Sequence, residues 1–493
     1  MYSYHIFYFP FKWEIADKHC KSFSEQTDLN SIKFEKYSNW VYNPDPLNNK
    51  EWDELYNEKN YYYQFVHPVL YDTGKEESII KHFERKEPQE TEVFYKIAKK
   101  EGKTYILKVD AITLNLYTTG VGMLSFFLKN EKEDQKEPDD ILNINQYGRR
   151  IFPPFIGDLE SRYEIAEYLA IEGLTGNPNN YKEDFSQYNN KQYWHPSCFI
   201  QNLITDLTSS LKVEPVIDDR MFVNCWYGNE ELSQYIKNKT QINTEDPVIN
   251  FEKEDDFWYK YVFVDVNYIS CQDNELRKKL IKYQTYTRWQ GYGTLYGMSR
   301  YSFVSLSDES DYSKKILTAV HMRTIYARMI ELVIIQRASI LKFSNEVTRV
   351  SRLTDKYSNM QLEQIRSLYK EYIRFVNQIY FREITTQDQG IELYDLMSST
   401  LKTEEYIEDL DQEIEELHRY ASMMDDWKRG KNAEKLSIIA AIFLPATLIA
   451  GIFGMNGRSI LNDKWFNIQT FIIAIVFIVI ILYQKIKKIR HGK

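Results

Sequence analysis

The chain has 493 residues, a formal net charge of -9 and 43% hydrophobic residues. This length exceeds that of one ordinary domain, and the apolar fraction can fill a sizeable core. The acidic balance argues against a protein that mainly binds a nucleic-acid backbone, although it does not exclude a small nucleotide ligand. The cysteines are scattered, with no CxxC pair and no histidine at metal-ligand spacing, which indicates reduced thiols in a cytosolic body. They are Cys20, Cys198, Cys225 and Cys271.

The distribution of proline and glycine divides the chain. Twelve of the 13 prolines precede residue 250, whereas residues 298–429 contain no proline and a single glycine, Gly390. Long helices need such a stretch, and short strands with turns do not. We therefore expect a mixed α+β/α class: a cytoplasmic α/β domain over residues 1–310, a helical stalk region over 311–435, and a transmembrane hairpin with a basic tail over 436–493.

Short runs rich in aromatic and β-branched residues indicate strands in the first domain, with helix-like runs between them. The aromatic N-terminus lacks a basic segment before an apolar core, so it predicts a first strand and not a signal peptide. A run of charged residues ending in Pro-Asp-Asp predicts a solvated loop at 129–140. Strands are predicted at 4–9, 105–116, 222–227 and 259–266, and helices at 159–171 and 274–283.

Three helices are predicted in the second region. Apolar residues recur at helical spacing from about residue 312 to 335, and a second helix spans about 362–381. In the third helix, apolar residues alternate at steps of three and four, which forms a heptad seam that seeks partner helices. The alternative is a helix packed within its own domain. The seam consists of Ile407, Leu410, Ile414, Leu417, Ala421 and Met424.

Two apolar segments follow. Residues 436–453 hold only Ser437 and Thr447 as polar side chains, and residues 465–483 form a second apolar segment. Each is near the roughly 20 residues that cross a bilayer core as a helix. Basic residues precede the first segment and follow the second. We therefore expect a multi-pass protein of the cell inner membrane with both termini in the cytoplasm.

The first apolar segment ends in Gly454-Met455-Asn456. A long apolar helix with this ending, a short loop and one last helix resembles the CorA family of magnesium and divalent-cation channels, over about residues 385–493. The run 386–394 looks like the start of that family's long stalk helix. The resemblance implies a homo-oligomer of five subunits in a lipid bilayer. It also implies a transported or regulatory divalent cation such as Mg²⁺, with no other cofactor.

In this family the first membrane helix of each subunit lines the pore. On a helical wheel Leu436, Leu444, Thr447 and Gly454 share one face. Rings of leucine would close a pore by excluding water, and Asn456 would offer amide oxygens that suit a hydrated cation. The alternative for Thr447 is a hydroxyl bonded to its own helix. The expected pore residues are Leu436, Leu444, Thr447, Gly454, Met455 and Asn456.

Two charged segments bear on this interpretation. The loop over residues 457–464 departs from the acidic loop of most family members, because it holds one acidic and two basic residues. This weakens the negative field that would concentrate cations at the mouth. Residues 404–416 carry eight acidic residues and no basic one. In this family cytoplasmic acidic sites bind divalent ions and hold the channel shut; the alternative is a solvated face.

Three polar clusters in the first domain combine arginine with aromatic residues and turns. Arginine binds phosphate bidentately, and aromatic faces stack on bases, so the clusters predict a nucleotide pocket. The alternative is ordinary pairing of arginine with aspartate and aromatic packing. The candidate ligand-binding residues are Arg149, Arg150, Asp218, Asp219, Arg220, Arg288 and Trp289.

CorA-like proteins with an enlarged N-terminal domain also accompany type III CRISPR systems as membrane effectors switched by a nucleotide second messenger, and this chain is similar in layout. We therefore expect a cation channel gated from its cytoplasmic domain by a small nucleotide, with no long nucleic acid as partner. The alternatives are a constitutive magnesium uptake channel regulated by divalent ions and a membrane-tethered binding module. The sequence shows no hydrolase or nucleotide-loop motif, so no enzyme is expected.

Overall fold

The computed structural model describes residues 1–455 apart from 17–22, 37, 45–57, 101, 152–164, 186–195, 219, 243–254, 268 and 352–358, together with residues 468, 472 and 475. The chain divides into two compact units, Met1–Glu415 and Glu416–Lys493. The first unit is a mixed α/β domain. In the described part of the second unit, most of the residues belong to one long helix, α13 (Thr403–Met455), which begins in the first unit.

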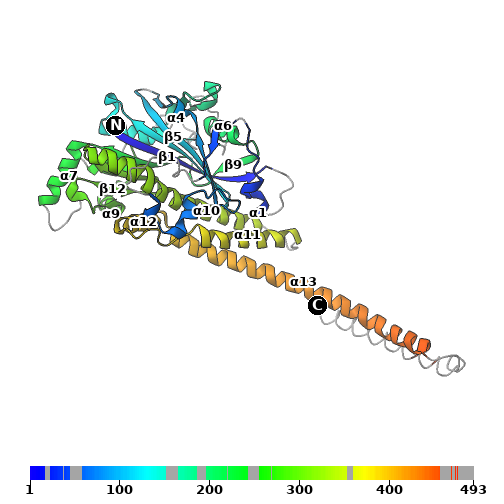
Figure 1. The fold of residues 1–493 in the computed structure, drawn as a ribbon. Helices are drawn as coiled ribbons and strands as arrows, with labels where there is room; N and C mark the ends of the chain where they lie inside the picture. Colours follow the sequence, from blue (N-terminus) through cyan, green and yellow to red (C-terminus); the bar gives the residue numbers. More distant parts are fainter. Residues whose placement is uncertain are drawn as a thin grey trace. The chain divides into compact units, whose positions relative to one another are not determined.

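A mixed sheet forms the centre of the first unit (Figure 1). Its central strand β1 (Ser3–Ile15) pairs antiparallel with β6 (Val121–Asn130) and β10 (Phe222–Gly228). Among the described strands, the single parallel pair joins β10 to β13 (Ser302–Ser307). The order along the sheet is β11 (Thr285–Tyr286), β12 (Leu295–Met298), β13, β10, β1, β6, β5 (Thr104–Tyr117), β4 (Phe94–Lys99), β7 (Ala166–Glu172) and β8 (Lys182–Asp184). Outside this path lie β2 (Trp40–Tyr42), β3 (Ile80–Arg85) and β9 (Leu211–Pro215).

Strand β1 is buried on both faces over residues 6–11, which explains why this run is continuously aromatic and apolar without alternating polar residues. Phe7, Phe9 and Phe11 belong to a hydrophobic core that also includes residues of the helices α5 (Pro138–Gly148), α6 (Cys198–Leu207) and α8 (Asp255–Phe263). On the opposite face, the Tyr8 hydroxyl donates a hydrogen bond to the carbonyl oxygen of Ala327, 3.1 Å away.

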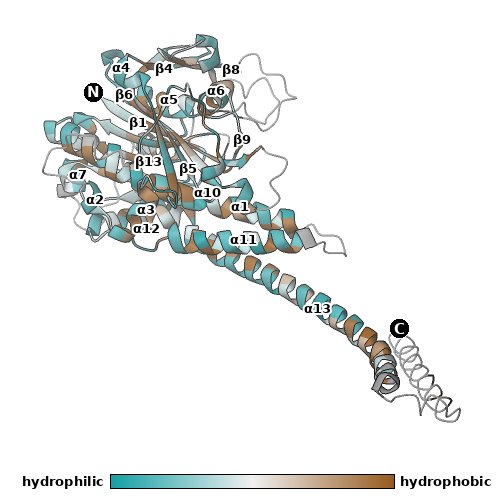
Figure 2. Ribbon diagram, turned by 45° about the vertical axis from the view of Figure 1, so that its right-hand side comes forward, coloured by the Kyte–Doolittle hydropathy of each residue, from teal (hydrophilic) through white to brown (hydrophobic). Residues whose placement is uncertain are grey.

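That opposite face is covered by helix α10 (Tyr326–Ser351), as Figure 1 shows. A π-helix, Ser313–Ile325, leads into it. Helices α11 (Asn359–Gln378) and α12 (Asp388–Leu401) pack against α10. The remaining α-helices are α1 (Phe23–Gln26), α2 (Glu58–Tyr61), α3 (His67–Leu70), α4 (Glu87–Glu90), α7 (Glu230–Ile242) and α9 (Asn274–Gln284). Figure 2 shows hydrophobic residues gathering toward the carboxyl end of α13.

The predicted strand at 259–266 is wrong, because this segment lies largely in helix α8. Aromatic rings four residues apart stack along that helix. The ring centroids of Phe257 and Tyr261 are 5.4 Å apart, and those of Tyr259 and Phe263 are 4.5 Å apart. Such pairs stabilise a helix, and they override the strand preference of the individual residues.

The predicted helix at 159–171 is wrong where the structure describes it, because Ala166–Glu172 forms strand β7. Antiparallel pairing with β4 places Leu169 opposite Ile97, so a partner distant in sequence decides the conformation. The predicted loop at 129–140 is also wrong at both ends. Strand β6 extends to Asn130, and helix α5 begins at Pro138, where proline fits the first helical position.

The run 386–394 does not begin the longest helix. Helix α12 ends at Leu401, and Lys402 follows in the left-handed region at φ 54°. The Lys402 backbone N–H donates to the carbonyl oxygens of Ser398 and Ser399, which closes the helix. Helix α13 therefore starts anew at Thr403.

Candidate functional site

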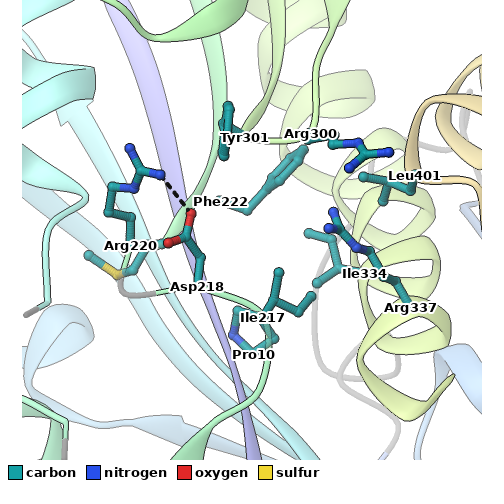
Figure 3. Close-up of a pocket in the computed structure, with 11 residues that line it drawn as sticks. Pro10, Ile217, Asp218, Arg220, Phe222, Arg300, Tyr301, Ile334, Arg337 and Leu401 are labelled. Carbon is teal, nitrogen blue, oxygen red and sulfur yellow. Dashed lines mark hydrogen bonds and ion pairs between the residues drawn. The ribbon is translucent and has the colours of Figure 1, made fainter. Parts of the chain in front are cut away.

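A small cavity lies in the first unit beside helix α10 (Figure 3). Its volume of about 20 Å³ exceeds the roughly 10–15 Å³ that one water molecule needs, but it is far below the space for a whole nucleotide. Pro10 of β1, Ile334 of α10 and Leu401 of α12 supply apolar walls. The charged residues that line it are Asp218, Arg220, Arg300 and Arg337.

The turn between β12 and β13 brings two of the lining residues to the cavity. The Ser299 backbone N–H donates to the carbonyl oxygen of Ser302 at 2.8 Å, and the Tyr301 N–H donates to the Ser299 hydroxyl at 3.2 Å. This tight turn places Arg300 and Tyr301 together at its tip. Tyr301 is 38% exposed and Arg300 is exposed, so the cavity is reached from solvent on this side.

The Tyr301 ring joins two of the three polar clusters predicted from sequence. Arg149 Cζ lies 5.5 Å from the ring centroid, and Arg220 Cζ lies 5.0 Å from it. Arg220 also pairs with Asp218 at 3.0 Å, and an isolated antiparallel bridge connects Arg150 with Arg220. The structure therefore brings these side chains into one neighbourhood, although they lie about 70 residues apart in the sequence.

The guanidinium group of Arg149 is engaged by the protein itself. Arg149 is 1% exposed, and its Nη2 donates to the Val264 carbonyl oxygen at 3.3 Å and to Gln146 Oε1 at 3.2 Å. Its own carbonyl oxygen accepts from the Met221 N–H at 2.7 Å. Arg149 thus ties helix α5 to the segment that carries Arg220. Asp219, another predicted ligand residue, lies outside the described residues.

The third polar cluster is separate from this neighbourhood. Arg288 Nη1 lies 2.5 Å from Glu392 Oε1, and its Nη2 lies 3.6 Å from Asp388 of the same helix, α12. Hydrogen bonding to Glu392 raises the pKa of Arg288. Trp289 lies beside it, with its ring centroid 5.9 Å from Arg288 Cζ. This ion pairing is the alternative that the sequence left open for Arg288.

Two arginines of the cavity were not predicted from sequence. Within the described part of the chain, Arg300 and Arg337 form neither an ion pair nor a hydrogen bond, and Arg337 Nε is buried without a partner. Burial lowers the pKa of Arg337, and the neighbouring positive charge of Arg300 lowers it further. No local motif marks these residues, because the turn and helix α10 bring them together only in the folded chain.

Most of the predicted pore residues lie at the end of α13. Leu436 and Leu444 are each 66% exposed within the second unit. Thr447 Oγ1 donates to the carbonyl oxygens of Phe443 and Leu444 at 2.9 Å, as the alternative interpretation of this hydroxyl expects. Gly454 and Met455 are the last residues of the helix, and Asn456 lies outside the described residues. Among the helices as far as the structure describes them, none has the length and apolarity to cross a membrane.

The amino-terminal part of the heptad seam packs within its own unit. Ile407, Leu410 and Ile414 are buried, and the Tyr372 hydroxyl of α11 donates to the Ile407 carbonyl oxygen at 3.4 Å. This supports intradomain packing for these three positions. The eight acidic residues over 404–416 are all exposed, and in the described part of the chain no group of His, Cys, Asp and Glu side chains is placed to hold a metal ion.

Comparisons with known proteins point to one family. Residues 305–488, from strand β13 through both apolar segments, match the family described as CorA-like Mg²⁺ transporter protein. A search of curated proteins finds no significant match. Among solved structures, the complete structure of the CorA magnesium transporter from Methanocaldococcus jannaschii matches with 12% identity and a TM-score of 0.23, covering 56% of this chain and 94% of that chain. A likeness of this strength does not bear on the fold, and the family match covers residues 305–488 alone.

Proposed function

We propose that the chain forms a homo-oligomeric divalent-cation channel of the cell inner membrane, because residues 305–488 match the family described as CorA-like Mg²⁺ transporter protein. The observation that carries the proposal is the end of helix α13. Its sequence is apolar over residues 436–453 and closes with Gly454 and Met455, directly before Asn456. The exposed leucines at 436 and 444 need partners, which neighbouring subunits and lipid would supply.

The proposed topology places both termini in the cytoplasm. Residues 436–453 and 465–483 would each span the bilayer, with the basic residues before and after them on the cytoplasmic side. Subunits would associate around a central axis as a closed ring, and the family resemblance suggests five of them. Asn456 would then contribute one amide per subunit to the pore mouth, where it would contact a cation that retains its water.

Ion flux into proteoliposomes tests this proposal. Vesicles that contain the purified chain and a trapped magnesium indicator should show protein-dependent Mg²⁺ entry. Asn456→Ala should reduce that entry at least tenfold while size-exclusion chromatography shows the same oligomer. Asn462→Ala, which changes an amide in the same connecting segment, is the matched control and should retain the flux. Equal flux through the Asn456→Ala variant and the parent would falsify the proposed role of Asn456.

We also propose that a small nucleotide gates the channel, as in a CRISPR-associated effector. The supporting observation is the convergence of Arg149, Arg150, Arg220 and Asp218 around Tyr301. Arginine and an aromatic ring are the groups that hold phosphate and base. If a nucleotide opens the channel, magnesium entry should rise when it is added on the side of the N-terminal domain. A constitutive magnesium channel would show the same flux with and without it.

A further inference from the structure

We propose that Arg300 and Arg337 bind one phosphoryl group at the cavity beside helix α10. Figure 3 shows the two arginines on one side of this cavity, next to Leu401, and the Asp218–Arg220 pair on the other. Arg300 comes from the β12–β13 turn and Arg337 from the middle of α10, so two separate elements place them together.

Among the lining residues that the structure describes, the positive charges outnumber the negative ones. Arg220 and Asp218 form an ion pair at 3.0 Å, so their two charges cancel. Arg300 and Arg337 then leave a formal excess of +2 among the described lining residues, and neither forms an ion pair there, although the charge of Asp218 acts on Arg337 without contact. Two like charges held together, one with a buried and unpaired Nε, are costly unless an anion compensates them. A phosphate dianion has the matching charge.

The geometry also suits a phosphoryl group. Guanidinium groups present several N–H donors in a plane and bind phosphate oxygens bidentately. The cavity of about 20 Å³ admits a group little larger than one water molecule, and the exposed edge formed by Arg300 and Tyr301 leaves room for the rest of the ligand outside. The apolar side chains of Ile334 and Leu401 exclude water from one wall, which strengthens the charge interactions.

The position of Leu401 suggests how such a ligand would act. Leu401 is the last residue of α12, and α13 begins two residues later at Thr403. An anion held between α10, the β12–β13 turn and Leu401 would therefore fix the start of the helix that carries the apolar segment. A regulatory effect of this kind rests on the proposed channel function and requires different affinities of the anion for the open and closed states. The binding site itself does not require it.

Binding to the full-length protein in detergent tests the inference without any flux measurement. The probes are inorganic phosphate, AMP and adenosine, titrated by calorimetry at constant ionic strength. We expect phosphate or AMP to bind, and the affinity to fall at least tenfold in Arg300→Met and in Arg337→Met. Arg366→Met, which removes an arginine paired with Glu363 on α11, is the matched control and should bind like the parent.

The arms of the test separate the sources of the phosphoryl group. Tighter binding of AMP than of phosphate, with none for adenosine, assigns the site to a nucleotide; equal binding assigns it to free phosphate. Should neither anion bind the parent, or should the double variant Arg300→Met/Arg337→Met bind both as well as the parent, the inference is wrong. Anion binding without magnesium flux would overturn the proposed channel function and leave this site standing.

Discussion

The amino group of Lys342, on helix α10, donates a hydrogen bond to the carbonyl oxygen of Gly120, in the turn between β5 and β6, at 3.1 Å. Gly120 has a φ of +72°, and a Cβ atom there would overlap Lys342 Nζ and Thr27 Cγ2. Glycine is therefore required for both the backbone conformation and the close approach of the lysine.

We predict that Gly120→Ala lowers the thermal stability of the detergent-solubilised protein. The left-handed conformation alone costs an alanine about 1–2 kcal/mol, and displacement of Lys342 adds to that. Gly291→Ala is the control, because a Cβ atom at Gly291 meets nothing within 4 Å. Equal melting temperatures for the two variants would contradict this account of the turn.

The burial of Lys342 predicts a pH dependence of stability. Burial lowers the pKa of Lys342 from 10.5 to about 8, although Glu14 and Glu346 raise it in part. Between these two values the unfolded chain binds a proton that the folded chain has released, so the free energy of unfolding rises with pH over this window. The gain is about 3 kcal/mol in total.

Lys342→Met should abolish that contribution. Melting curves of the parent and the variant between pH 7.5 and about 10 should therefore diverge, with the parent gaining stability relative to the variant as the pH rises. Buried tyrosines affect both proteins alike and cancel in the comparison. A constant difference in melting temperature across this range would show that Lys342 keeps its proton in the folded protein.

Replacement of Arg149 by alanine should lower the stability of the protein much more than replacement of Arg288. Arg149→Ala removes the buried donor to the Val264 carbonyl oxygen and the guanidinium beside Tyr301, which should destabilise the first unit by roughly 1–3 kcal/mol. Arg288→Ala breaks exposed pairs with Glu392 and Asp388 and should leave the melting temperature nearly unchanged. If AMP binding survives both in the folded protein, neither residue belongs to the phosphoryl site.

The sequence predicted those elements whose pattern is local. The aromatic run at 4–9, the apolar run at 222–227 and the helix at 274–283 are confirmed as parts of β1, β10 and α9. Strand β7 and helix α8 were assigned the wrong type for a physical reason. The conformation of β7 depends on pairing with β4, and that of α8 depends on rings stacked four residues apart. The secondary-structure propensities of single residues contain neither interaction.

The candidate site shows the same limit. Arg220 was predicted to bind a ligand because it belongs to a polar cluster and arginine binds phosphate bidentately, and it does line the cavity. Arg300 and Arg337 were missed, because each is an unremarkable arginine in its own segment. They become a candidate site through the position of the β12–β13 turn against α10, which is a tertiary relationship. The carboxyl end of α13 could be recognised from the sequence alone, because its apolar run and the residues that close it are contiguous in the sequence.

The last prediction concerns Leu444, which lies on the pore-lining face of the first membrane helix in the proposed channel. A ring of leucine side chains closes a narrow pore because water is unfavourable between apolar walls. Leu444→Asn would line the same ring with amides and let water and ions remain. Proteoliposomes with this variant should therefore leak Mg²⁺ without any added ligand, several-fold above the parent. Leu448→Asn, four residues along the helix and equally exposed at 66%, is the control for a general loss of helix packing. A leak of the same size in both variants, or none in Leu444→Asn, would show that Leu444 does not form the constriction.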